Sequence, residues 1–297
     1  MLIALLVPLV LAVLLFSFVL VRSAVRQRAL PKLEAIIVGA IVCFFDALGI
    51  GSFAPTAAWL KFRRLVPDGL IPQNMLVGLT PPSIAEAIIF LVLLGGLVDA
   101  PLLVGCVLAL LLGGLVGVPL VTRARVWVVQ LVVAIALVIA AVAYAMTNLH
   151  LFPGGGTASS LPLSLMIIAI AANFAFGILV NFGVGNFAPS LVMFGLMGLD
   201  PRYAFPIMAG GAALMGAAAS TRHIQIGKID LRIVLGLAIG GIPAVLVAAL
   251  IVKSMPVETL RWLVIIVVLY AATVMFRAAL LGRREHHPEG ATAPVLE

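Results

Sequence analysis

Two copies of one short motif contain the residues best suited to hold a ligand. Gly49-Ile-Gly-Ser-Phe-Ala-Pro-Thr56 recurs as Gly183-Val-Gly-Asn-Phe-Ala-Pro-Ser190, at an offset of 134 positions (183 − 49). Glycine frees the backbone from side-chain constraints, so each Gly-x-Gly predicts a break in an apolar helix. A helix broken inside a bilayer persists only where protein or water satisfies the released polar groups. Each break therefore predicts a cavity.

The residues after each break predict the start of a new helix. Ser52 and Asn186 are typical N-cap residues, and Pro55 and Pro189 fall within the first turn, where a missing N–H does no harm. Each start would point unpaired N–H groups and a positive dipole end into the membrane. Two such ends meeting at a repeat interface predict an anion site without a buried Lys or Arg. The alternative is that the glycines only permit close helix packing, but the second copy of the motif favours the site.

Other polar side chains could reach the same cavity, especially around Thr80-Pro-Pro-Ser83 and around Ser220-Thr221. A hydroxyl in a membrane helix, however, often bonds its own backbone instead of a ligand. The predicted substrate-binding set comprises Gly49, Gly51, Ser52, Phe53, Thr56, Asn74, Thr80, Ser83, Asn181, Gly183, Gly185, Asn186, Phe187 and Ser190.

Two carboxylates, Asp46 and Glu86, lie within apolar stretches of the first half. An intramembrane carboxylate is costly, so both are candidates for coupling transport to protons. The alternative is that they face a water-filled vestibule or pair with a basic residue. The repeat places Val180 and Ser220 opposite them, so a carboxylate role would be asymmetric. Arg222 could attract an anion at the cytoplasmic mouth, or could be an ordinary positive-inside anchor.

These residues must be positioned by membrane helices. Of 297 residues, 64% are hydrophobic and 10% are charged, which indicates that the bilayer is one of the solvents of this chain. The apolar runs are continuous, unlike the alternating strands of a membrane β-barrel. The net charge of +7 comes from residues in short loops, so it does not indicate nucleic-acid binding. The longest runs are Leu2–Val21, Pro101–Val121, Val126–Met146, Leu231–Val252 and Leu260–Leu280.

The offset divides the chain into related halves. We predict an extra N-terminal helix and basic loop (1–31), repeat 1 (32–146), an inter-repeat loop (147–162), repeat 2 (163–280) and a flexible polar tail (281–297).

Charge placement indicates how the halves are related. If the chain turns back at each Gly-x-Gly, 15 of the 18 Lys and Arg residues share one side, leaving only Arg202, Lys253 and Arg261 on the other. We expect the protein in the inner (plasma) membrane. Because basic residues collect on the cytoplasmic side, the C-terminus is expected in the cytoplasm. Each half then crosses an odd number of times. The predicted fold is an all-α polytopic protein of two inverted repeats, whose re-entrant or discontinuous helices meet near the midplane.

At Gly49-Ile-Gly51 and Gly183-Val-Gly185, each opening one half of a duplicated helical protein, the sequence resembles the TauE/SafE sulfite exporter family. The resemblance implies transport of sulfite, a sulfonate such as sulfoacetate, or another small organic anion, often outward from bacteria. It also implies that the four glycines line the substrate path. Ser52 and Asn186 stand where the family commonly has a third glycine.

An intramembrane enzyme is the rival class, and the residues oppose it. Ser52 and Asn186 stand where an aspartyl protease would have its catalytic Asp after Gly-x-Gly, and the four histidines lie in loops or the tail. No cofactor or metal site is predicted. An anion channel could use the same helix ends, but inverted repeats favour alternating access. We therefore predict a secondary carrier, most simply an exporter, of a small sulfur oxyanion or sulfonate. Proton coupling and a homodimer remain open.

Overall fold

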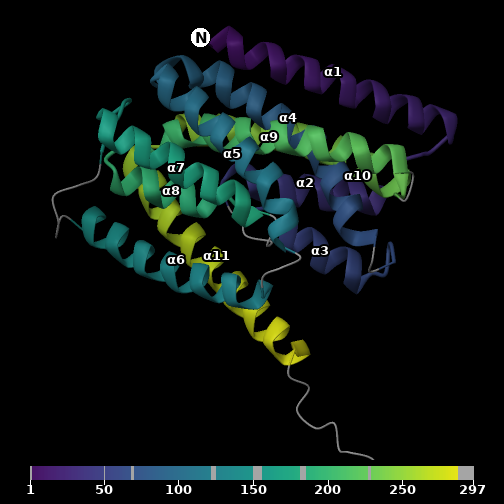
Figure 1. The fold of residues 1–297 in the computed structure, drawn as a ribbon. Helices are drawn as coiled ribbons and strands as arrows, with labels where there is room; N and C mark the ends of the chain where they lie inside the picture. Colours follow the sequence, from purple (N-terminus) through teal and green to yellow (C-terminus); the bar gives the residue numbers. More distant parts are fainter. Residues whose placement is uncertain are drawn as a thin grey trace, which may run out of the picture.

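The computed structural model describes residues 2–49, 51–67, 70–121, 125–149, 156–180, 185–226 and 229–286, and these residues are almost entirely helical (Figure 1). They contain no β-strand, and the single bridge between Ala158 and Leu199 is isolated. The helices are α1 (Leu2–Arg26), α2 (Leu33–Ala47), α3 (Phe53–Phe62), α4 (Ile71–Leu93), the 3-10 turn η2 (Gly95–Leu97), α5 (Ala100–Val121), α6 (Val126–Asn148), α7 (Leu163–Val180), α8 (Phe187–Leu196), α9 (Pro201–Ile226), α10 (Leu231–Ser254) and α11 (Val257–His286).

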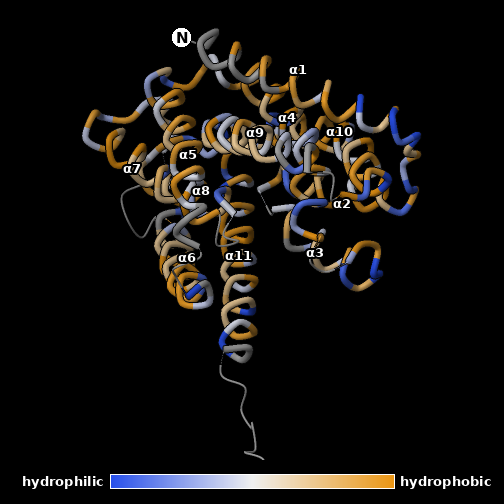
Figure 2. Tube along the Cα trace, turned by 45° about the vertical axis from the view of Figure 1, so that its right-hand side comes forward, coloured by the Kyte–Doolittle hydropathy of each residue, from blue (hydrophilic) through white to orange (hydrophobic). Residues whose placement is uncertain are grey.

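Seven of the described helices, α4 to α7 and α9 to α11, are long and apolar enough to cross a membrane. Their outer surfaces carry large apolar side chains such as Val132, Ile139 and Ile266, each about 60% exposed or more. Hydrophilic residues gather near the ends of helices such as α1 and α3 (Figure 2). An apolar belt with polar ends is stable only against lipid, so the prediction of a multi-pass all-α membrane protein is confirmed.

Pairs of helices from the two halves pack closely. The four most extensive pairings are α2 with α10, α5 with α7, α6 with α11, and α4 with α9. Small residues permit this approach: a Cβ added at Gly113 of α5 would collide with the carbonyl oxygen of Phe174 in α7, and one at Gly240 of α10 would collide with that of Ile36 in α2. Lipid supplies no hydrophobic drive between helices, so such contacts supply much of the cohesion.

The chain reverses direction after α2 and again after α7. The Arg63 side chain, just past the end of α3, pairs with Glu34 in the first turn of α2, with 2.8 Å between Nε and Oε1. In the second half, the Asp200 N–H after α8 donates to the carbonyl of Ala158 before α7, at 3.0 Å. Each short helix therefore returns to the end of the molecule from which the preceding helix started.

These contacts define two ends of the bundle. The basic face holds the end of α1 and the starts of α2, α4 and α10, where the Lys32 N–H donates to the carbonyl of Arg232 at 3.1 Å. The opposite face holds Asp99, the chain from Ser159 to α7, Asp200 and the start of α11. α1 lies along the outside, mainly against α9, and buries Phe16 and Leu20 (Figure 1).

The two short helices have different surroundings. α8 packs against α6, α7, α9 and α11 and buries nearly all of its residues. α3 packs mainly against α2 and α4, and its Phe53, Trp59 and Phe62 are 48%, 40% and 79% exposed. In both the ribbon and the tube view α3 stands apart from α6, whereas α8 lies within the bundle (Figures 1 and 2).

Candidate functional site

The first Gly-x-Gly forms the turn between α2 and α3, and both glycines are required by its geometry. Gly49 and Gly51 have φ angles of +96° and +89°, in the region that L side chains rarely adopt. A Cβ at Gly49 would come within 2.9 Å of Leu191 Cδ1 in α8, whereas one at Gly51 would meet nothing within 4 Å. The tip of the first hairpin thus touches the short helix of the second half.

Asp46 binds the start of α3. Its carboxylate accepts the backbone N–H of Ser52 at Oδ1, at 2.9 Å, and the hydroxyl of Ser52 at Oδ2, at 2.8 Å. Ser52 occupies the N-cap position of α3, but its side chain makes no capping bond. The predicted helix start at Ser52 is therefore confirmed, but its hydroxyl donates to the Asp46 carboxylate and its side chain accepts no N–H of α3.

The second motif begins α8 without a carboxylate. Asn181 and Gly183 lie outside the described residues. Gly185 is exposed, and a Cβ there would meet nothing within 4 Å. Asn186 is the N-cap of α8 but again makes no side-chain cap, because its Nδ2 donates to the carbonyl of Met208 in α9, at 3.2 Å. The predicted helix start at Asn186 is confirmed here too, and its side chain links α8 to α9.

The hydroxyls at the end of the two motifs differ. Thr56 Oγ1 donates to the carbonyl of Ser52, at 2.7 Å, and is satisfied within its own helix. Ser190 is fully buried, and its Oγ has no hydrogen-bond partner. Phe187 is buried, whereas Phe53 is half exposed. The start of α8 therefore combines an unused hydroxyl, open space at Gly185 and first-turn N–H groups that have no partner within the helix.

Other members of the predicted set hold helices together. Thr80 Oγ1 lies 2.8 Å from Ser220 Oγ and donates to the carbonyl of Leu76 in its own helix, linking α4 to α9. Asn74 Nδ2 donates to the carbonyl of Leu70, while its Oδ1 accepts the N–H of Asp230, at 2.7 Å. Asn74 therefore lies at the basic face rather than near the motifs, and Ser83 is half buried in α4.

Glu86 is buried in α4, and its Oε1 has no hydrogen-bond partner. It lies close enough to Asp46 for the two charges to interact. Neither carboxylate forms an ion pair among the described residues, so the hypothesis that they pair with a basic residue finds no support there. Arg222 falls within α9, and its side chain lies outside the described part of the structure.

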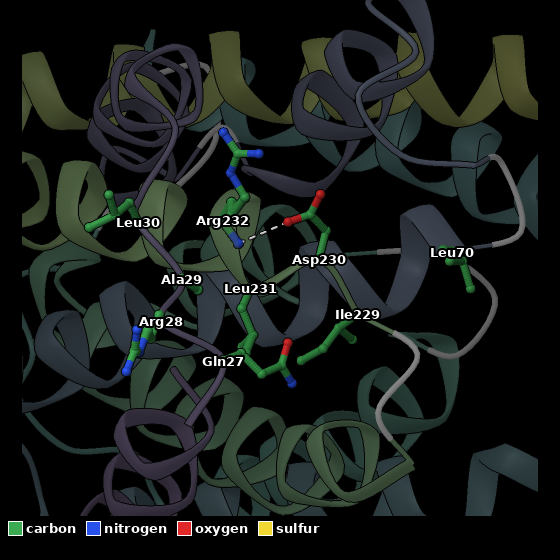
Figure 3. A pocket seen from close by; sticks show the side chains of 9 residues that line it. All are labelled: Gln27, Arg28, Ala29, Leu30, Leu70, Ile229, Asp230, Leu231 and Arg232. Atoms are coloured by element: carbon green, nitrogen blue, oxygen red, sulfur yellow. Dashed lines mark hydrogen bonds between the residues drawn. The ribbon is translucent and has the colours of Figure 1, made fainter. Parts of the chain in front are cut away.

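A cavity of about 680 Å³ opens at the basic face, between the end of α1 and the start of α10 (Figure 3). Its polar lining includes Gln27, Arg28 and Arg232, and Asp230 accepts the backbone N–H of Arg232, at 2.9 Å. No residue of the predicted substrate set lines this cavity.

Sequence reasoning missed three polar residues at the opposite face. Tyr144 and Asn148 on α6 and Arg261 on α11 each have a buried donor without a partner. Only their spacing of four residues on a predicted helix could have indicated that Tyr144 and Asn148 share a face.

Seven helices long and apolar enough to cross a membrane define a multi-pass membrane protein, and buried polar groups lie at a helix start within its bundle. The family model described as sulfite exporter TauE/SafE matches residues 165–296, which lie in the second half of the chain, and the resemblance predicted from the sequence is confirmed over those residues. Comparison with curated proteins and with solved structures gave no match. The family consists of transporters rather than enzymes, consistent with the expectation that the chain catalyses no reaction.

Proposed function

We propose that the protein is a secondary carrier that exports a small sulfur oxyanion or organosulfonate, such as sulfite or sulfoacetate, across the bacterial inner membrane. The observation that carries the proposal is the start of α8, where the buried Ser190 hydroxyl has no partner and Gly185 borders open space. Unpaired N–H groups and the positive helix end favour an anion there. The family name supports sulfur chemistry.

Inverted repeats are supported by the way the helices exchange partners. The order α2 to α6 corresponds to α7 to α11, each with a ten-residue second helix. Under this correspondence the pairing of α2 with α10 becomes that of α7 with α5, and the pairs α4 with α9 and α6 with α11 map onto themselves. The short helices depart most from this correspondence, because α8 packs against α6 and α11 whereas α3 has no comparable pairing with either helix. A carrier that alternates between two states would show such a difference between its halves.

The two short helices would bind the anion unequally. Asp46 already occupies the donors at the start of α3, whereas α8 has Val180 at the corresponding position. The substrate would therefore bind at α8, close to Gly49 and Leu191, with Asp46 as a nearby negative charge. Protonation of Asp46 or Glu86 would lower repulsion of the anion, which makes them candidates for proton coupling.

The basic face would lie in the cytoplasm, because basic residues accumulate there. An anion channel, or a carrier of another small organic anion, is the alternative. The exchange of helix partners between the two halves favours a carrier, because inverted repeats typically support alternating access.

The proposed function is tested first by thermal stability of the purified protein with sulfite, sulfate, thiosulfate, sulfoacetate, taurine, acetate and nitrate. Selective stabilisation by a sulfur anion is expected, followed by saturable flux and counterflow of that anion in proteoliposomes. Stabilisation by acetate alone would remove sulfur from the proposal, and flux without counterflow would indicate a channel.

The site is tested by Ser190→Ala. Loss of one hydrogen bond to the anion should raise the half-saturating concentration of that anion roughly tenfold. Thr273→Ala is the matched control. Thr273 is an exposed residue of α11, and its hydroxyl donates a hydrogen bond to the carbonyl of Leu269, at 2.8 Å. Equal transport by the two variants would contradict the placement of the substrate at α8.

A further inference from the structure

Three buried hydrogen-bond donors at the opposite face have nothing to donate to. They are the hydroxyl of Tyr144, Nδ2 of Asn148 and Nε of Arg261, none of which has a partner among the residues that the structure describes. Natural proteins rarely bury such groups unpaired, so each one needs an explanation. That all three can donate, and that one carries a positive charge, indicates a missing acceptor of negative charge.

The three groups belong to one region. Tyr144 and Asn148 are one helical turn apart on α6, so their side chains share a face. α11 packs along α6, and the charge of Arg261 acts on the Tyr144 hydroxyl. Arg261 is anchored at its outer end, where Nη2 donates to the carbonyl of Gly156, at 3.0 Å, which leaves Nε for a ligand.

The acidic group that acts on Tyr144 is already paired. The charge of Asp200 also acts on Tyr144, but its carboxylate accepts Nη2 of Arg202, at 2.6 Å, and the Arg202 backbone N–H, at 2.9 Å. Among the described residues Arg261 forms no ion pair. The region therefore keeps an excess of positive charge and of donors.

The region is closed in this structure. Gly195 of α8 lies so near the Tyr144 ring that an added Cβ would collide with it, and the unpaired donor atoms are inaccessible to solvent. α8 therefore covers α6 and α11 at this end, whereas α3 does not pack to a comparable extent against either of these two helices. Covering unpaired donors costs free energy, and that cost would be relieved when α8 moves away.

We propose that Tyr144, Asn148 and Arg261 form a second oxyanion-binding site at the opposite mouth, which the transported anion occupies when α8 leaves α6 and α11. The proposal rests on the proposed function for the identity of the anion. A pyramidal or tetrahedral oxyanion has several acceptor oxygens, so one ligand can satisfy all three donors at once.

The decisive variant is Tyr144→Phe, which removes the hydroxyl and keeps the ring against Gly195. Zero-trans fluxes of sulfite are measured from each face in vesicles of uniform orientation. The half-saturating concentration should rise roughly tenfold from the opposite face and stay unchanged from the basic face. Tyr270→Phe, on the exposed side of α11, should change neither value. No change from the opposite face, or an equal change from both, overturns the proposal.

Thermal stability provides a second readout. A tyrosine hydroxyl with a structural partner would lower the melting temperature when removed, but an unpaired one should not. Tyr144→Phe and Asn148→Leu without ligand are therefore expected to melt at or above the wild-type temperature. A clear decrease for both would show that the donors have structural partners and would overturn the proposal.

Failure of the proposed function can be distinguished from failure of this site. If the wild-type protein transports no sulfur anion, the function is wrong, and the site is judged by thermal stabilisation with chloride, sulfate and thiosulfate. The site stands if one of these anions stabilises the wild type and Tyr270→Phe but loses its effect in Tyr144→Phe and Arg261→Gln. It falls if no anion makes that distinction.

Discussion

Asp46 and Ser52 form a paired contact at the turn between α2 and α3: both carboxylate oxygens accept donors from the same residue, at 2.9 and 2.8 Å. A substrate anion at the start of α3 would bind the same N–H and hydroxyl of Ser52, so the Asp46 carboxylate would compete with the anion for these donors. The second half has Val180 and Asn186 at the corresponding positions. We therefore expect protons to affect the first hairpin more than the second.

Replacing Asp46 by Asn should flatten the pH dependence of transport. In the wild type, protonation at lower pH removes a negative charge beside the proposed anion site, so binding should strengthen as pH falls. The variant has no charge there to titrate, and Glu86 on α4 and Cys43 on α2 are the titratable groups that remain nearby. Half-saturating sulfite is measured from about pH 5 to pH 8 in both proteins.

Glu34→Gln is the control for this prediction, because its carboxylate pairs with Arg63 at the basic face and lies outside the proposed site. It should keep the wild-type pH profile. If Asp46→Asn also keeps that profile, Asp46 is not the proton-coupled group, and Glu86→Gln becomes the next variant to measure.

The two glycines of the first turn should differ in their tolerance of alanine. Both have positive φ angles, which cost an L residue about 1–2 kcal/mol. Gly49→Ala must also displace the Leu191 side chain, whose Cδ1 would lie 2.9 Å from the new Cβ, and overpacking adds about 1–3 kcal/mol. Gly51→Ala should therefore melt below the wild type, and Gly49→Ala should melt lower still.

Gly96→Ala provides the matched control, because its Cβ would meet nothing within 4 Å and its φ angle is not in the left-handed region. It should melt within a degree or two of the wild type, as surface substitutions generally do. Equal losses for Gly49→Ala and Gly51→Ala would mean that the first hairpin does not press against α8.

The fold could be predicted from the sequence because its signals are long and repeated. Apolar runs of helical length predict the crossing helices, and the repeated Gly-x-Gly marks the places where the chain turns back. The exposed α3 and buried α8 could not be predicted, since their sequences begin with the same Phe-Ala-Pro. Their difference comes from which helices of the other half cover them.

The candidate site was only partly predictable for the same reason. Ser52 carries a strong N-cap signal, but the carboxylate that takes its hydroxyl lies six residues earlier, across a turn. Tyr144 and Asn148 lie near the end of a largely apolar run, and Arg261 looks like a loop anchor. Their lack of partners is a property of the assembled bundle, so no local pattern could indicate it.

The hydroxyl pair between Thr80 and Ser220 should couple α4 to α9. The two oxygens lie 2.8 Å apart, and Ser220 Oγ also lies 3.3 Å from the carbonyl oxygen of Leu76. Hydrogen bonds between membrane helices average about 0.6 kcal/mol in double-mutant cycles, because the unfolded state in the membrane also finds partners. A cycle of Thr80→Val and Ser220→Ala should therefore give a coupling of about 0.6 kcal/mol in reversible unfolding from detergent.

A parallel cycle of Thr80→Val and Thr221→Val shows whether that coupling is specific. Thr221 is the neighbour of Ser220, but its hydroxyl donates to the carbonyl of Ala217 within α9, at 2.9 Å. This second cycle should give a coupling near zero. If the two cycles give the same value, the energy comes from general packing between α4 and α9 rather than from the hydroxyl pair, and the crossing would then depend on Gly216, whose added Cβ would lie 3.0 Å from Thr80 Oγ1.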